Sequence, residues 1–260
     1  MEASSAEPLR SDRMGAIVGT AGWSIARAEA GRFPAEGSAL ARYSSCFAGV
    51  EINSSFHRPH RPSTWARWAA EVPASFRFAV KMPKTITHQR KLADCADLAA
   101  RFLAEAAPLG PKLAVLLVQL PPKLAFDAAL AREFFEELRA TSGATPVCEP
   151  RHPSWFEGAA DALLESLGVA RAAADPAVTA AAASPGGWRG LSYWRLHGSP
   201  VMYRSSYDDA RLRAYAEAIR AALSEGRDAW CMFDNTASSV ATANALALIA
   251  RLGPAGPDRG

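Results

Sequence analysis

Hydrophobic and polar residues alternate along several short stretches of the chain, and charged residues occupy the polar positions. In the stretch 50–55, Val50 and Ile52 fall on one face of a strand, and Glu51 and Asn53 fall on the other. Segments with the apolar spacing of helices separate these stretches. Strands that alternate with helices predict a parallel sheet covered by helices, so the charged faces should meet in an enclosed interior.

Eight strands are expected from this pattern. They are placed at 16–20, 49–53, 76–82, 113–119, 145–149, 169–175, 191–197 and 229–234. Helices are expected between them, with Asp94 and Asp127 as N-caps, while the crossover at 176–187 is weak and expected mostly as loop. The size and rhythm predict an α/β fold of the TIM-barrel class, in which a closed parallel sheet of eight strands is surrounded by outer helices.

The alternative fold is an open, doubly wound sheet. That fold calls for a glycine-rich phosphate turn after the first strand, and the chain supplies only Gly19 and Gly22 there. We therefore expect a single barrel domain at 15–252. A disordered polar tail is expected at 1–14, and a flexible tail at 253–260.

Composition narrows the possible partners and the compartment. The chain has 260 residues and a formal net charge of +3, which is too small to favour nucleic acid as a partner. The four cysteines form no CxxC pair, so neither a zinc site nor a disulfide framework is indicated. The first fourteen residues lack the apolar core of a signal peptide or membrane anchor. We expect a cytoplasmic protein without a membrane partner, and the sequence leaves its oligomeric state open.

Charged residues recur at the downstream ends of the predicted strands, where TIM barrels carry their catalytic groups. If the apolar faces contact the helices, the inward residues at this end are Glu51, Asn53, Lys81, Gln119, Glu149, Arg195 and His197, with Asp175 and Arg151 as additions. The competing interpretation is a buried ion network that only fills the interior. Because such a network is costly to bury, its presence favours a functional use.

Roles follow from the chemistry of each side chain. Glu51 and Glu149 face each other across the predicted interior and suit a general base and a general acid, if burial raises the pKa of one of them. Lys81 and Arg195 suit the binding of an anionic or enolate-like oxygen. His197 suits a proton shuttle, although a hydrogen-bonded structural histidine is the commoner case.

Loops beyond the strands add candidate substrate-binding groups. Arg151 suits a bidentate clamp on a carboxylate or phosphate, or a salt bridge to Glu149. The loops at 197–200 and 235–239, with Gly198 and Asn235, suit an anion cradle, with ordinary helix capping as the alternative. Asp234, just before the second loop, is a further substrate-binding candidate. The loop aromatics are expected to stack on a ligand or simply to pack: they are Trp23, Phe56, Trp155 and Tyr203.

Several motifs occur together and in order: GTAGWS, VEINSSFHRP, FAVKMPKTITH, LLVQLPP, EPRHPSWF, WRLHG and DNTASSVATANA. With these motifs, which cover roughly 16–250, the chain resembles the domain-of-unknown-function 72 family, also called YecE-like. The resemblance implies a TIM-barrel fold and no established reaction. The chain differs from the usual pattern at Ile25, Ala28 and His57, and it has Asp234 and Asn235 where many relatives have two asparagines.

Three functions remain as hypotheses. The first is an acid–base enzyme (an isomerase, lyase or hydrolase) that needs no cofactor and acts on a small polar substrate, either anionic or sugar-like. The second is a metal-dependent phosphodiesterase acting on nucleic acid, by fold analogy with endonuclease IV. Its single divalent ion would be held by Glu51, Glu149, Asp175 and His197. The third is a noncatalytic anion-binding module.

Overall fold

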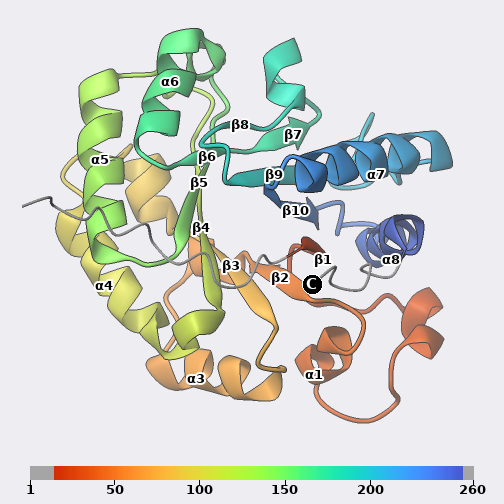
Figure 1. Ribbon diagram of the computed structural model, residues 1–260. Helices are drawn as coiled ribbons and strands as arrows, with labels where there is room; N and C mark the ends of the chain where they lie inside the picture. The colour runs from red at the N-terminus through yellow and green to blue at the C-terminus, as the bar shows by residue number, and fades with distance from the viewer. Residues whose placement is uncertain (1–14, 254–260) are drawn as a thin grey trace, which may run out of the picture.

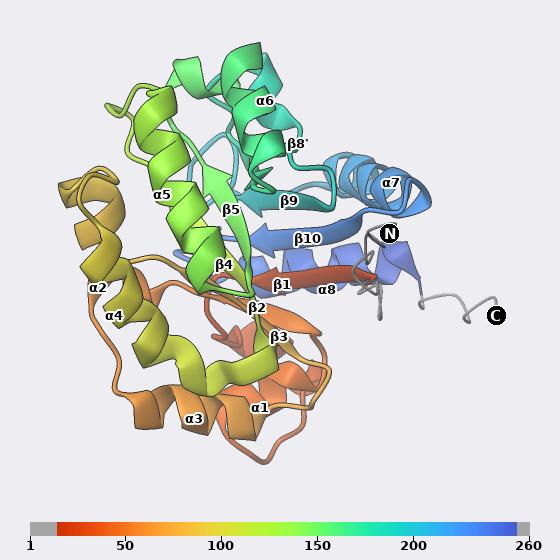
Figure 2. The same cartoon turned by 60° about the vertical axis from the view of Figure 1, so that its left-hand side comes forward.

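Helices surround two adjoining β-sheets in the computed structural model, which describes residues 15–253 (Figure 1). The first sheet has four parallel strands in the order β1-β10-β9-β7, which are Ala16–Thr20, Asp228–Phe233, Leu191–Leu196 and Ala173–Asp175. The second has six strands in the order β2-β3-β4-β5-β6-β8, which are Gly49–Ile52, Arg77–Lys81, Leu113–Gln119, Thr145–Glu149, Ala170–Arg171 and Gly186–Gly187. Only the β6–β8 pair within these sheets is antiparallel. Figure 2 shows β1, β10 and β9 side by side with their arrowheads on the same side.

Eight α-helices and five shorter helical turns connect the strands of the described residues. The α-helices α1 to α8 are Ala39–Ser44, Ser54–His57, Pro62–Glu71, Ala96–Ala106, Ala128–Thr141, Gly158–Ser166, Asp209–Ser224 and Ala241–Leu252. The turns η1 to η5 are Arg27–Arg32, Thr85–Gln89, Ala107–Lys112, Pro153–Phe156 and Ala180–Ala183. Asp127 caps α5 as predicted, but α4 starts after Cys95, so Asp94 is not its cap. The weak sixth crossover contains only η5 and β8.

The predicted strand at 169–175 spans a seam between the two sheets. Its first half, β6, pairs with β5, and the Ala172 N–H donates to the Cys148 carbonyl at 2.8 Å. Its second half, β7, pairs instead with β9. The fold is α/β and TIM-barrel-like, but the prediction of one closed sheet of eight strands is wrong, because the strands divide into sheets of four and six.

The second seam lies between β1 and β2, where a tyrosine side chain replaces most of the backbone ladder. The Tyr43 hydroxyl accepts from the Thr20 N–H at 2.9 Å and donates to the Gly49 carbonyl at 3.3 Å. Direct pairing is limited to the Ala21–Glu51 bridge. A Cβ atom on Gly19 would collide with the Gly49 carbonyl, so glycine is required where the two backbones cross.

Apolar side chains form two layers, one on each face of the strands. The larger layer lies between strands and helices and includes Trp194, as its position in the alternation predicts. The inner layer comprises Ile17, Ala79, Val115, Leu117, Val147, Ala170, Ala172, Leu191, Tyr193, Trp230 and Met232. Within it, the rings of Tyr193 and Trp230 stack with their centroids 6.0 Å apart. The inner layer therefore fills the space between the two sheets.

Other expectations concern the ends of the chain, the cysteines and membranes. The predicted tails at 1–14 and 253–260 lie outside the described residues, apart from Gly253. All four cysteines are free thiols, and three of them are buried. In the part of the chain from 15 to 253, no helix combines the length and the apolar character that crossing a bilayer requires.

We predict that Tyr43→Phe lowers the free energy of unfolding by about 1–3 kcal/mol, because the Thr20 N–H and the Gly49 carbonyl would lose a shared buried partner. Urea titration followed by circular dichroism measures the change. Tyr203→Phe is the matched control, since Tyr203 is 42% exposed. Equal stability of the two variants would contradict the role assigned to the Tyr43 hydroxyl.

Candidate functional site

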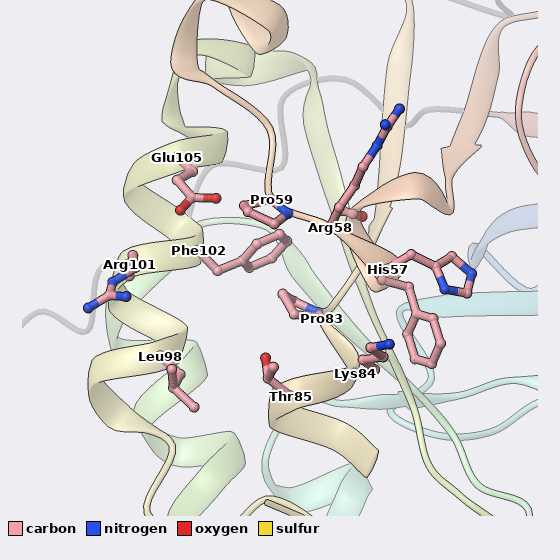
Figure 3. Close-up of a pocket in the computed structure, with 12 residues that line it drawn as sticks. His57, Arg58, Pro59, Pro83, Lys84, Thr85, Leu98, Arg101, Phe102 and Glu105 are labelled. Carbon is pink, nitrogen blue, oxygen red and sulfur yellow. The ribbon is translucent and has the colours of Figure 1, made fainter. Parts of the chain in front are cut away.

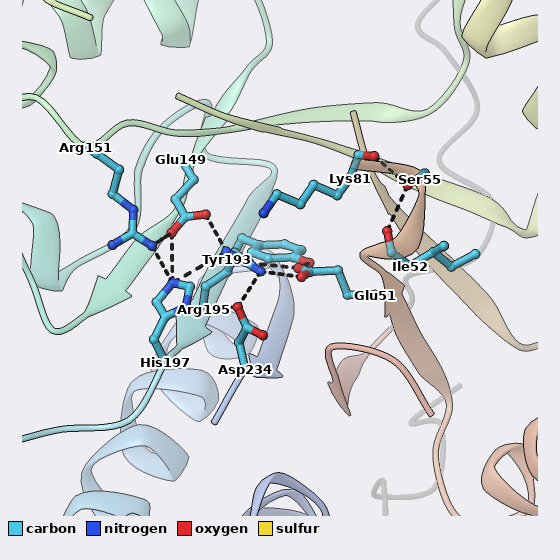
Figure 4. Close-up of polar contacts among 10 residues, drawn as sticks. All are labelled: Glu51, Ile52, Ser55, Lys81, Glu149, Arg151, Tyr193, Arg195, His197 and Asp234. Atoms are coloured by element: carbon cyan, nitrogen blue, oxygen red, sulfur yellow. Dashed lines mark hydrogen bonds and ion pairs between the residues drawn. The ribbon is translucent and has the colours of Figure 1, made fainter. Parts of the chain in front are cut away.

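Charged side chains gather at the C-terminal ends of the strands, next to the inner apolar layer (Figure 4). Alternation along parallel strands explains their position, because Tyr193 and Arg195 share a face of β9, and Val147 and Glu149 share a face of β5. We call this group the ionic cluster. Its members are Glu51, Lys81, Glu149, Arg151, Arg195, His197 and Asp234.

Arg195 is the centre of the ionic cluster. Its Nε and Nη2 donate to the two carboxylate oxygens of Glu51 at 2.9 and 2.5 Å, and Nη1 donates to Glu149 at 2.6 Å. Nη2 also donates to Asp234 at 3.0 Å. Arg195, Glu51 and Glu149 are 0% exposed. Burial alone would lower the pKa of Arg195, but the three carboxylates hold it well above its ordinary value, so this guanidinium is permanently charged.

His197 connects two carboxylates of the ionic cluster. Its Nδ1 donates to Asp234 Oδ2 over 3.0 Å, while its Nε2 lies 2.9 Å from Glu149 Oε1. The Nη2 atom of Arg151 lies 2.7 Å from the same Nε2 and also donates to Glu149 Oε1 at 2.5 Å. The ring can therefore pass a proton between the Asp234 side and the Glu149 side. The salt bridge between Arg151 and Glu149 is formed, as one of the two sequence interpretations expected.

Glu51 and Glu149 both form hydrogen bonds with partners inside the cluster. Burial would raise the pKa of Glu149, but Arg151 and Arg195 hold it well below its ordinary range. Burial acts on Asp234 in the same direction, and Arg195 and His197 again lower the pKa. A glutamic acid that acts as a general acid needs a pKa raised by burial. Glu149 does not meet this condition. The carboxylates of Glu149 and Asp234 are ionised at neutral pH.

Lys81 differs from every other member of the cluster. It is 8% exposed, and its ammonium lies 4.2 Å from the centre of the Phe56 ring. The ammonium makes no hydrogen bond or ion pair with any residue between 15 and 253, whereas the Lys81 carbonyl accepts from the Ser55 hydroxyl at 2.6 Å. Burial, assisted by the charge of Arg195, lowers its pKa to about 8, although the three carboxylates act in the opposite direction. Lys81 can therefore gain or lose a proton near physiological pH.

Three members of the cluster reach the surface. Lys81 is 8% exposed, and the side chains of Arg151 and Asp234 are 13% and 12% exposed. Arg151 Nε is buried and finds no hydrogen-bond partner among the described residues. Asp234 bonds to Arg195 and His197 through Oδ2 alone. This accessible face thus presents two cationic side chains beside a carboxylate.

Asp175 is not part of the cluster. Its carboxylate accepts from the Tyr207 hydroxyl at 2.6 Å and pairs with Arg211 of α7 at 2.7 Å, so it points toward the helices. The ion site predicted from Glu51, Glu149, Asp175 and His197 is therefore not assembled. Within the described residues, no three or more histidine, cysteine or acidic side chains are arranged so that they could hold a metal ion.

The loops predicted as an anion cradle make hydrogen bonds within the protein. The Gly198 N–H donates to the Tyr207 hydroxyl at 2.8 Å, and Asn235 Nδ2 donates to the Ser205 carbonyl and to Asn244 at 3.0 and 2.9 Å. Gly198 has φ +92°, and a Cβ there would press on the Ser205 backbone. These bonds tie the loop after β9 to α8 and leave no backbone amide of Gly198 for an anion.

The remaining predicted residues lie beside the cluster or away from it. Gln119 is in register with Glu149 and is half-buried, and the buried Oδ1 of Asn53 lacks a partner among the described residues. Trp23 packs edge-on against Trp68, with ring centres 5.1 Å apart. Trp155 is a core residue, so simple packing is the correct alternative for it.

Sequence reasoning missed Tyr193, whose hydroxyl donates to Glu51 at 2.9 Å. The available signal was its spacing, because Tyr193, Arg195 and His197 alternate onto one face of β9. Phe56 and Tyr203, expected as loop aromatics, both contact the cluster. The Phe56 ring covers Lys81, and the Tyr203 ring meets His197 edge-on at 5.7 Å.

An apolar pocket of about 240 Å³ lies outside the cluster, between α4 and the loops after β2 and β3 (Figure 3). Leu98 and Phe102 of α4 form one side, and Pro59 and Pro83 form the other. Phe56 is shared, since it lines the pocket and covers Lys81. The pocket could therefore influence the position of the Phe56 ring.

The fold and the cluster define an α/β protein with a buried ionic site at the ends of its strands. The chain belongs to the family described as protein of unknown function DUF72, whose model matches residues 17–259. Over 84 residues it is 36% identical to the UPF0759 protein YecE of Escherichia coli (strain K12), a match that covers 32% of this chain and 31% of that protein.

Two solved structures of DUF72 family proteins have the same fold. One, from Enterococcus faecalis V583, is 19% identical with a TM-score of 0.77, and the match covers 92% of this chain and 96% of that chain. The other, from Thermotoga maritima MSB8, is 22% identical with a TM-score of 0.73 and coverage of 90% and 97%. At these identities the likeness shows the fold alone.

We predict that Lys81→Met raises the free energy of unfolding at pH 7 by about 1–3 kcal/mol. The pKa of Lys81 is lowered from 10.5 to about 8, so the folded state holds the ammonium less readily than the unfolded state does. That cost is complete below pH 8 and disappears as the pH rises to 10.5, so the advantage of the variant should shrink over this interval. Urea titrations across the pH range measure it.

The control for this prediction is Lys112→Met. The ammonium of Lys112 donates to the carbonyls of Ala69 and Val72 at 2.6 and 2.7 Å, so its removal should lower stability. If Lys81→Met is destabilised as strongly as the control, the lysine is a structural member of the cluster.

Proposed function

We propose that the protein is an acid–base enzyme that acts on a small polar substrate, anionic or sugar-like, at the C-terminal ends of the strands. Lys81 is the group that exchanges the proton with the substrate. The observation that carries this proposal is a lysine with a pKa of about 8 that has no polar partner, while every carboxylate around it is paired. General bases work best when their pKa lies near the working pH.

The accessible face supports a substrate that carries both acceptors and donors. The Arg151 side chain is 13% exposed, so its guanidinium can contact an acceptor group of a substrate. Asp234 presents a partly exposed carboxylate, which suits a hydroxyl group. An oxyanion or carbonyl next to a hydroxyl fits this combination.

The buried members support the accessible ones. Arg195 and Glu51 are enclosed, so they hold the shape and charge of the site rather than contact a substrate directly. His197 lies between Glu149 and Asp234, where it can return a proton to the accessible face. Hydrogen bonds that are already formed need no reorganisation during the reaction, which favours catalysis.

The phosphodiesterase hypothesis finds less support. It needs several metal ligands in one place, and Asp175 faces α7. A noncatalytic anion-binding module is favoured by the cationic side chains of Arg151 and Lys81 at the accessible face, but this hypothesis gives no reason for a lysine whose pKa is close to neutrality. The two predictions below separate binding from catalysis.

We expect the protein to exchange carbon-bound protons of a small hydroxy or oxo acid, or of a sugar phosphate, with deuterium from the solvent. Proton nuclear magnetic resonance of such compounds in deuterium oxide detects the exchange. The rate should rise with pH around 8, because only neutral Lys81 accepts a proton. Lys81→Met should lower it about 100-fold or more. The exposed Lys123→Arg serves as the control that keeps the wild-type rate.

We expect millimolar phosphate to raise the melting temperature relative to chloride at equal ionic strength, because any ligand of the native state stabilises it by mass action. Arg151→Gln should reduce this rise. The effect should weaken above pH 8, where Lys81 loses its charge. Binding without proton exchange on any compound of the panel would favour the noncatalytic module, and no shift at all would count against both functions.

A further inference from the structure

The ionic cluster contains a mismatch between its carboxylates and its permanent cations. Three carboxylates, those of Glu51, Glu149 and Asp234, face two guanidinium groups. Only a protonated Lys81 supplies the third positive charge. The three carboxylates thus favour a cation at this position, and burial and Arg195 oppose it.

Lys81 donates to no carboxylate of the cluster, because other donors already occupy the oxygens of the two glutamates. Both oxygens of Glu51 and both oxygens of Glu149 already accept from Arg195, Arg151, Tyr193 or His197. Lys81 consequently keeps an ammonium that is bonded to no described residue and is covered on one side by the Phe56 ring. An amine that is not held by hydrogen bonds has its lone pair available once the proton is lost.

Arg151, like Lys81, has a nitrogen that bonds to no described residue. Its Nη2 atom is used by Glu149 and His197, while its buried Nε atom has no partner in the described part of the chain. Figure 4 shows the Lys81 ammonium and the Arg151 guanidinium on either side of the Glu149 carboxylate. The Arg151 side chain is 13% exposed and, like Lys81, adjoins Glu149, so an anionic group of a ligand bound at Lys81 can lie next to Arg151.

We propose that Lys81 is a nucleophile that forms an imine with the carbonyl group of a small 2-oxo acid whose carboxylate is held by Arg151. This inference rests on the proposed function and names its substrate class. The neutral amine attacks the carbonyl carbon, one proton of the attacking nitrogen moves to the carbonyl oxygen, and a neutral carbinolamine results. Loss of that oxygen as water, with one further proton from solvent, breaks the C–O bond and leaves a protonated imine on Lys81.

The product places a positive charge next to the carboxylates of the cluster, and the carboxylate of the 2-oxo acid lies next to Arg151. A protonated imine keeps a positive charge at the Lys81 nitrogen, opposite the three carboxylates, whatever the pH at which the amine itself titrates. The groups that face this nitrogen are Arg195, Glu149, Glu51, Asp234 and His88. The lowered pKa of Lys81 supplies the reactive amine near neutral pH, and the carboxylates stabilise the cation that follows.

Borohydride trapping tests the proposal directly. The full-length protein is incubated with pyruvate, a small 2-oxo acid, and reduced with sodium borohydride, which converts the imine into a stable secondary amine. Mass spectrometry of the intact protein and of its peptides should show one pyruvate adduct, located on Lys81. Lys112, whose pKa is also lowered but whose ammonium has two carbonyl partners, is the internal control and should remain unmodified.

Two variants and a second probe sharpen the test. Lys81→Arg should abolish the adduct while a thermal melt shows that the protein stays folded, and Lys123→Arg should retain it. Acetone has a carbonyl group but no carboxylate, so it should need about tenfold more probe for the same modification. Arg151→Gln should remove this preference for pyruvate.

The outcomes distinguish the two levels of the proposal. Modification spread over exposed lysines, or none at Lys81, overturns the imine. If Lys81-dependent proton exchange is nevertheless observed, the acid–base function stands and Lys81 acts only as a base. If both the trapping and the exchange fail, the proposed function fails as well.

Discussion

The rest of the structure depends on the ion pairs of the Arg195 guanidinium, because they join the two sheets. Arg195 lies on β9 of the four-stranded sheet, and it binds Glu51 of β2 and Glu149 of β5 in the six-stranded sheet. Backbone hydrogen bonds are sparse where the sheets meet, since β1 and β2 share one bridge and β6 and β7 pair with different neighbours. Side-chain ion pairs therefore connect what the backbone does not.

A buried ion pair is an expensive way to join two sheets. Removing ions from water costs several kcal/mol each, and apolar residues of similar size often give equal or greater stability. Arg195 offsets that cost with four hydrogen bonds to three carboxylates. Tyr193 adds a second donor to Glu51 Oε2, and His197 contacts Glu149 Oε1. Retention of such a cluster is easier to understand if it also prepares a site, and Lys81 is the member for which packing alone gives no reason.

The alternation of charged and apolar residues along the strands predicted much of this site. It failed where neighbouring side chains differed too little in polarity. Charged residues between apolar ones made the inward face readable on β2, β3, β5 and β9, so Glu51, Lys81, Glu149 and Arg195 were assigned together. The stretch 170–174 is rich in alanine, which gives no clear period, and Asp175 was therefore placed on the wrong face. The division into two sheets depends on contacts such as that of Tyr43 with Gly49, which no local pattern reveals.

The inner apolar layer has a consequence for how the site communicates with water. The interior directly behind the ionic cluster is filled by Trp230, Met232 and Tyr193, which are 0% exposed. That side of the cluster is therefore an apolar region of low dielectric constant. Among the described residues, the cluster meets solvent at the side chains of Lys81, Arg151 and Asp234. A ligand that covers these three side chains therefore controls the solvent contact of the charges behind them.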